Sequence, residues 1–163
     1  MSETARLADL VIQVMDGDPW HGSNVVSLLE GVSHQVAAAR PAAGGHSIWE
    51  LVLHMTGWTD EVRARLSGRR AGDPIGGDWP EVTDVSQAAW ARAVAALVAS
   101  HAALADAVRT VDGPALVEPA RETRDPAAGT GFSQYLTVHG LVHHTAYHAG
   151  QIALLVKSAR VPR

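Results

Sequence analysis

SIWELVLHMTGWTDEVRARL, residues 47–66, is the stretch that decides the fold class of this chain of 163 residues. Ser47 is a suitable N-cap residue and Glu50 stands three positions later, which is the arrangement of a capping box. The apolar residues that follow recur every three or four positions, the period of one face of a helix. They are Ile48, Leu51, Met55, Trp58, Val62 and Leu66. The segment therefore predicts an amphipathic helix that ends near Gly68.

The same period recurs on both sides of this segment. We expect a first helix over 3–15, which breaks at 16–19 because Gly17 and Pro19 interrupt helices, and a helical pattern that resumes over 23–31. After residue 66, Asp84 with Gln87 can cap a helix that runs to about Val111. No segment alternates apolar and polar residues as a strand would.

Two loops and a last helix complete the expected organisation. The segment 69–83 is rich in Gly and Pro and predicts a long crossover loop between the second and third long helices. A further loop passes through Pro119, Pro126 and Gly129 and leads to a helix from about Phe132 to Ser158. Four long amphipathic segments predict an all-α four-helix bundle, and a chain of this length suits one domain over residues 1–163.

Composition excludes several functional classes. The formal charge is −4 and the basic residues are scattered, so nothing in the chain favours the phosphate backbone of nucleic acid. Met1–Leu10 carries Glu3, Arg6 and Asp9, unlike a secretory signal, and the longest apolar run, 93–99, is too short for a membrane span. We expect a soluble, cytoplasmic protein. With no cysteine, any thiol chemistry would need a small-molecule thiol.

The histidines are the main candidates for chemistry. The chain has nine, and four of them, at positions 139, 143, 144 and 148, fall within ten residues. His144 and His148 are four apart on a predicted helix, a spacing that turns about 40° and rises about 6 Å, so both rings can reach one ion. They share the apolar stripe of the last helix, and His54 lies beside the stripe of the second long helix.

Buried histidines need partners, because an unpaired buried polar group costs on the order of 1–3 kcal/mol. One divalent ion would satisfy His54, His144 and His148 together. The alternative is that these are core histidines hydrogen-bonded to water, carbonyl groups or each other. We expect His34 and His101 at the surface, and His143 facing solvent or a subunit contact.

Two histidine segments resemble a known family. HSIWELVLH (46–54), followed by Trp58, resembles the second helix of the DinB/YfiT-like metal-binding four-helix bundles, and HGLVHHTAYHAGQI (139–152) resembles their last helix. Trp20-His21-Gly22 and Asp78-Trp79-Pro80 fit the same group. The resemblance covers nearly the whole chain.

The resemblance implies an up-down-down-up bundle with a three-histidine site for one divalent ion, such as nickel, zinc, iron or manganese. The ligand positions of the family fall on His54, His144 and His148. The resemblance also implies a homodimer, and some members are S-transferases or isomerases that use a low-molecular-weight thiol.

Other residues are candidates for contact with the ligands or the pocket. Glu50, one turn before His54, and Gln151, on the stripe of His144, are placed to orient ligand imidazoles. His21 and Trp20 lie at the helix break, where an irregular backbone could turn them toward the site. Trp49, Trp58 and Trp90 are interpreted as core, and Trp79 as an anchor of the crossover loop.

Three functions remain open from the sequence. The first is a metal-dependent enzyme, either a thiol-dependent S-transferase or a hydrolase acting on a small electrophile, because three protein ligands leave a coordination position open. The second is a non-enzymatic protein that binds metal or a small molecule in a stress response. The third is a dimeric structural bundle with a vestigial site.

Overall fold

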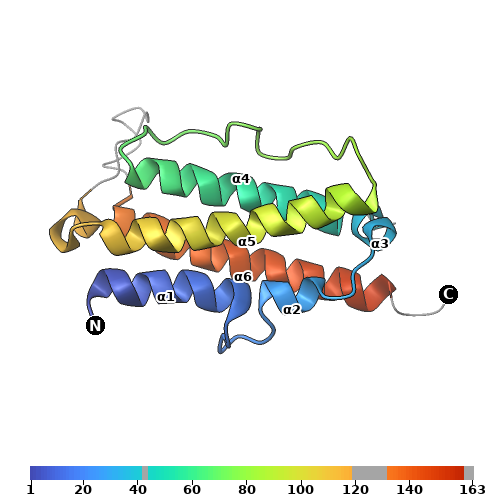
Figure 1. The fold of residues 1–163 in the computed structure, drawn as a ribbon, viewed down its shortest axis with the longest axis horizontal. Helices are drawn as coiled ribbons and strands as arrows, with labels where there is room; N and C mark the ends of the chain where they lie inside the picture. Colours follow the sequence, from blue (N-terminus) through green and yellow to red (C-terminus); the bar gives the residue numbers. More distant parts are fainter. Residues whose placement is uncertain (42–43, 119–131, 160–163) are drawn as a thin grey trace.

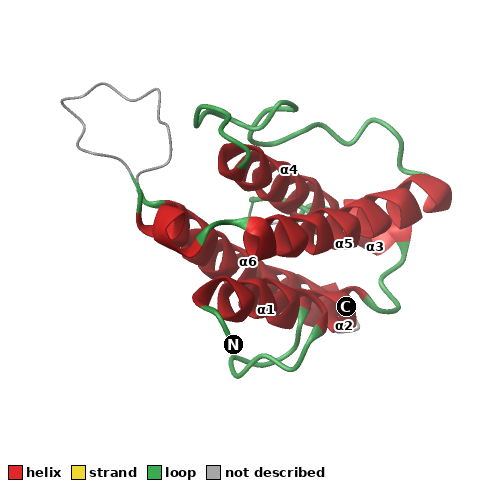
Figure 2. Ribbon diagram, turned by 60° about the vertical axis from the view of Figure 1, so that its left-hand side comes forward, coloured by secondary structure: helices red, strands yellow, loops and turns green. Residues whose placement is uncertain are grey.

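The computed structural model describes residues 1–41, 44–118 and 132–159, and these ranges contain helices and no β-strand (Figure 2). The all-α prediction is confirmed. The long helices are α1 (Glu3–Asp16), α4 (Ile48–Leu66), α5 (Gln87–Thr110) and α6 (Gln134–Ala159). The short ones are α2 (Val25–Leu29), α3 (His34–Ala38), which we did not predict as a separate element, and the 3-10 helix η1 (Gly113–Val117).

Short polar side chains fix where the helices begin. At α4 the predicted capping box is confirmed: the Glu50 amide donates to Ser47 Oγ over 3.2 Å, and the Ser47 amide donates to Glu50 Oε2 over 2.8 Å. At α5 the expected cap on Asp84 is wrong by two residues. Ser86 is the N-cap and accepts from the Ala89 amide, while Asp84 Oδ1 accepts from the Ser86 amide. The Asp-Gly segments that follow α1 and α5 end these helices where the sequence predicted.

The four long helices lie side by side along the length of the molecule (Figure 1). Both α1 and α4 pack against α5 and against α6. The core has one part beside α2 and α3, around Met55, Leu97 and Ile152, and another around Leu7, Leu104 and Val138. The face that α4 and α6 turn toward each other is the one that carries the three candidate histidines.

Residues 67–86 connect α4 to α5 and run along the outside of the packed helices from one end to the other (Figure 1). The buried carboxylate of Glu61 fixes the start of this crossover loop, because it accepts from Arg65 Nε and from the Gly72 amide, both over 3.0 Å, and pairs with Arg69. Farther along, a Cβ on Gly57 would lie 3.2 Å from Pro74 Cβ, so any larger residue there would push the loop slightly away from α4.

Within the described part of the chain, α5 is the helix with the length and composition of a membrane span. Its apolar face is used inside the bundle, where Leu97, Leu104 and Val108 are fully buried. Its place in the core accounts for part of its apolar character, since 39% of its most apolar stretch is buried.

Candidate metal centre

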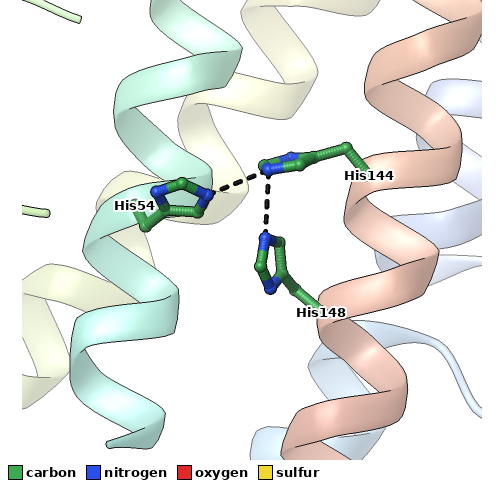
Figure 3. A group of neighbouring side chains, drawn as sticks. All are labelled: His54, His144 and His148. Atoms are coloured by element: carbon green, nitrogen blue, oxygen red, sulfur yellow. Dashed lines mark hydrogen bonds between the residues drawn. The ribbon is translucent and has the colours of Figure 1, made fainter. Parts of the chain in front are cut away.

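Three imidazole rings meet between α4 and α6 (Figure 3). His54 extends from α4, and His144 and His148 extend from successive turns of α6. His144 Nε2 lies 2.9 Å from His54 Nε2 and 3.0 Å from His148 Nε2. The three nitrogens lie within 4.8 Å of one another, close enough to hold one ion.

Two of the rings are oriented by acceptors on their other nitrogen. His54 Nδ1 lies 2.7 Å from the carbonyl oxygen of Asp78, which can only accept, so Nδ1 carries the hydrogen. His148 Nδ1 lies 2.7 Å from Gln151 Oε1 and donates to it in the same way. In the neutral forms of these rings, both Nε2 atoms therefore present lone pairs to His144 Nε2.

The third ring cannot satisfy both of them. Burial, reinforced by the neighbouring His148 and His54, lowers the pKa of His144 to about 4, so the ring is neutral at pH 7 and carries one hydrogen. If that hydrogen is on Nε2, it can be donated to only one of the two neighbours. If it is on Nδ1, three lone pairs converge, and Nδ1 is buried without a hydrogen-bond partner in the described structure. A cation resolves the conflict, because it accepts all three lone pairs.

Two of the three spacings between the ring nitrogens also fit an ion. Two imidazole nitrogens that bind one ion at about 2.1 Å lie about 3.0 Å apart when the angle at the ion is near 90°, and about 3.4 Å apart at the tetrahedral angle. The observed 2.9 and 3.0 Å lie at the lower end of this range. Burial also lowers the pKa of His148, which keeps a second ring in the neutral form that binds metals.

Side chains of the crossover loop cover one side of the cluster. The Trp79 ring stacks on His54 with centroids 3.9 Å apart and planes 7° from parallel, and His46 stacks on the other face of Trp79 at 3.4 Å. Trp58 Nε1 donates to Asp78 Oδ1 over 2.7 Å. The anchoring role predicted for Trp79 thus extends to a ring of the cluster, since the same two loop residues, Asp78 and Trp79, hold His54 from its edge and its face.

A cavity of about 590 Å³ opens beside the cluster between α4 and α6. His54 and His144 form part of its wall, so an ion held by the cluster would be reached from the cavity. Trp58, interpreted from the sequence as core, is partly buried against the core and also lines this cavity. The other lining residues are Val62, Arg65, Asp78, Phe132, Leu136, Thr137, His139, Gly140, Leu141 and His143.

The four other candidate site residues have different positions. Gln151 contacts His148, as described above. Glu50, expected beside His54, is instead occupied by the cap of α4 and by an ion pair with Arg40, because the first turn directs its carboxylate back toward Ser47. Trp20 and His21, expected to turn toward the site, are exposed, Trp20 completely. The break after α1 turns outward, where Asn24 Nδ2 donates to the Gly17 carbonyl group.

One histidine was assigned wrongly. His101, expected at the surface, is 1% exposed on α5 and lies 3.3 Å from Thr145 Oγ1 and 3.0 Å from the Leu97 carbonyl oxygen. Burial lowers its pKa to about 4. His143 is exposed at the cavity rim, as its place one residue off the stripe indicated.

Sequence reasoning missed the Asp78 carbonyl group as a partner of His54. Every residue has a backbone carbonyl group, so the sequence does not indicate which one contacts a side chain. The available signal was Asp78-Trp79-Pro80 itself, which places an aromatic residue in a loop rich in Gly and Pro.

Comparison with known proteins assigns the chain to a family. Residues 20–152 match the family model described as the DinB superfamily. Neither the curated proteins nor the solved structures gave a significant match. The matched range includes α4, the crossover loop and the part of α6 that carries His144 and His148. The chain therefore belongs to the DinB superfamily.

Proposed function

We propose that this protein binds one divalent metal ion on His54, His144 and His148, and that it is a metal-dependent enzyme acting on a small electrophilic substrate. The supporting observation is that three imidazole nitrogens converge at the wall of an open cavity, with two of the rings already oriented for binding. Three protein ligands leave a position for substrate, which is typical of catalytic rather than structural sites. Nickel, zinc, iron and manganese all accept imidazole ligands, so the donor set does not select among them.

An ion held there would act as a Lewis acid that activates a nucleophile and polarises an electrophile. The protein itself orients the site. The Asp78 carbonyl group and Gln151 each hold a hydrogen on the outer nitrogen of a ligand ring, which keeps the inner nitrogen free. Apolar walls reduce the water around the reacting groups and so strengthen charge interactions there.

The nucleophile must come from outside the chain if it is a thiol, because the chain has no cysteine. Two reaction classes follow: transfer of a low-molecular-weight thiol to the electrophile, or hydrolysis by water. An S-transferase should bind its thiol only when metal is present. A hydrolase should turn over model esters or amides without thiol. A protein that only binds its ligand should take it up without consuming it.

Metal content tests the site directly. We expect about one equivalent of divalent metal in the purified protein by elemental analysis, and its loss in both His54→Ala and His144→Ala. His21→Ala is the matched control, because it removes an exposed histidine outside the cluster. If the native protein binds no metal after reconstitution with nickel, zinc, iron and manganese, the proposal is refuted and the histidines are hydrogen-bonded core residues.

We further propose that the protein is one domain over residues 1–163, an up-down-down-up bundle of α1, α4, α5 and α6, soluble in the cytoplasm. The path of the crossover loop supports the topology, since it returns the chain along the bundle before α5 begins. Burial of Leu7 supports a place for the first helix in the domain core. A homodimer is supported by Tyr147 and Leu154, which are 65% and 66% exposed on α6.

A further inference from the structure

The walls of the cavity differ in character along its length. At one end stand the two ligand rings, His54 and His144. Beyond them the wall is dominated by large apolar side chains from α4, α6 and the segment just before α6, namely Trp58, Val62, Phe132, Leu136 and Leu141. A volume of about 590 Å³ lies within the range of about 300–1,000 Å³ that holds drug-sized ligands.

The charged groups of the wall are already engaged. Arg65 donates from Nε to the buried Glu61 and from a terminal nitrogen to the Gly72 carbonyl oxygen, 2.9 Å away. The Asp78 carboxylate accepts from Trp58 Nε1 and lies 3.3 Å from His54 Nδ1. A divalent ion on three uncharged imidazoles would keep its full charge of +2. The strongest attraction for a ligand would therefore be that of the ion for an anion.

Polar groups at the rim of the cavity offer a ligand less attraction than the ion would. Thr137 Oγ1 donates to the Ser133 carbonyl group, and His139 packs against Tyr135. His143 is exposed. The ligand that matches such a cavity has one anionic head and an apolar body.

We propose that the cavity binds a small apolar acid, with its anionic head on the ion and its apolar body along Trp58, Val62, Leu136 and Leu141. This inference rests on the proposed metal site. It adds a substrate class: a molecule whose binding strengthens with apolar length and depends on a single anionic end.

Two glycines of α6 allow a matched test. A Cβ on Gly140 would meet no heavy atom within 4 Å, and Gly140 lines the cavity, so a larger side chain there would enter the space of the ligand. Gly150 lies on the same helix, is equally open and does not line the cavity. Leucine suits a helix interior better than glycine, so neither substitution should weaken the helix. Gly140→Leu and Gly150→Leu therefore differ in the cavity and little else.

The experiment is calorimetric titration of the zinc-loaded full chain with butanoate, hexanoate and octanoate, after its zinc content has been measured. We expect affinity to rise two- to fourfold with each methylene, since a buried CH₂ contributes about 0.8 kcal/mol, which is about fourfold at 25 °C. Octanoate should bind at least tenfold more weakly to Gly140→Leu and unchanged to Gly150→Leu. Octanamide, which lacks the charge, should bind at least tenfold more weakly than octanoate. Zinc-free protein should likewise bind octanoate at least tenfold more weakly than zinc-loaded protein.

The outcomes separate the two proposals. Full zinc content with no dependence on chain length, or an equal effect of the two leucines, overturns the apolar acid and leaves the metal site intact. Equal binding of octanoate and octanamide, or equal binding with and without zinc, overturns the anionic head. If the protein takes up neither zinc nor nickel, iron or manganese in the first measurement, the metal site and the present inference are both refuted.

Discussion

Replacement of Gln151 by methionine tests how the site is oriented. Gln151 Oε1 accepts from His148 Nδ1 over 2.7 Å, and His148 is 5% exposed. Methionine has a similar size and only a weak acceptor, so it leaves the Nδ1 hydrogen with little access to a partner. The ring can then move its hydrogen to Nε2 and donate it to His144 Nε2, 3.0 Å away. That tautomer must be abandoned before a metal binds.

The size of the effect follows from the lost hydrogen bond. Leaving a buried donor unpaired costs about 1–3 kcal/mol, which is about 5- to 150-fold in affinity at 25 °C. Loss of a hydrogen bond behind a metal-binding histidine commonly weakens metal affinity about 10- to 100-fold, which falls within that range. We expect zinc affinity to fall by about 10- to 100-fold in Gln151→Met.

Competition with a chromophoric chelator measures this affinity directly. Gln151→Glu is the matched variant, because it keeps an acceptor in the same place, and we expect it to bind zinc at least as tightly as the native protein. Nitrogen NMR of the metal-free protein should show His148 protonated on Nδ1 in the native chain. Native affinity in Gln151→Met would refute the reasoning, as would an equal loss in both variants.

Three further outcomes follow from buried groups and one exposed face. His101 has its pKa lowered to about 4 by burial, against about 6.5 when unfolded, so the unfolded chain takes up a proton first as the pH falls. Between pH 7 and pH 4, the free energy of unfolding of the native metal-free protein, measured in urea, should therefore fall by up to about 3 kcal/mol more than that of His101→Leu. Equal losses would contradict this. Glu61→Gln should lower the free energy of unfolding by about 1.5–3 kcal/mol, since it removes the charge of a buried carboxylate that pairs with the partly exposed Arg65 and Arg69. Asp60→Asn, which breaks an exposed pair, should cost less than about 1 kcal/mol, and similar costs would show that Glu61 is not the anchor. If α6 forms the dimer contact, Leu154→Glu should yield a monomer by light scattering, and an unchanged mass would place the contact elsewhere.

The helices were largely predictable because their signals are local. Ser47 and Glu50 stand three apart and form the cap that this spacing predicts. The spacing of His144 and His148 brings both rings to one face of α6, as helix geometry requires. These statements need only the neighbours of each residue along the chain.

Most of the errors at the site came from information that is not local. Which face of α5 is buried depends on the helices around it, so the burial of His101 beside Thr145 was missed. Glu50, in the first turn of α4, was placed either to cap the helix or to contact His54. It caps the helix, because Ser47 is nearer in sequence. The contact from the Asp78 carbonyl group to His54 depends on the path of a long loop, which no short pattern encodes.

The sequence separation of the three histidines has a consequence for how this protein holds together. His54 and His144 are 90 positions apart, and the chain between them includes the crossover loop and all of α5. A bond between such positions removes entropy from the unfolded chain worth about 4–5 kcal/mol in the loop-closure description of cross-links. An ion bound by both would act as a reversible staple in a chain that has no disulfides. The supply of metal in the cell would then govern the lifetime of the protein against proteases, whatever reaction it performs.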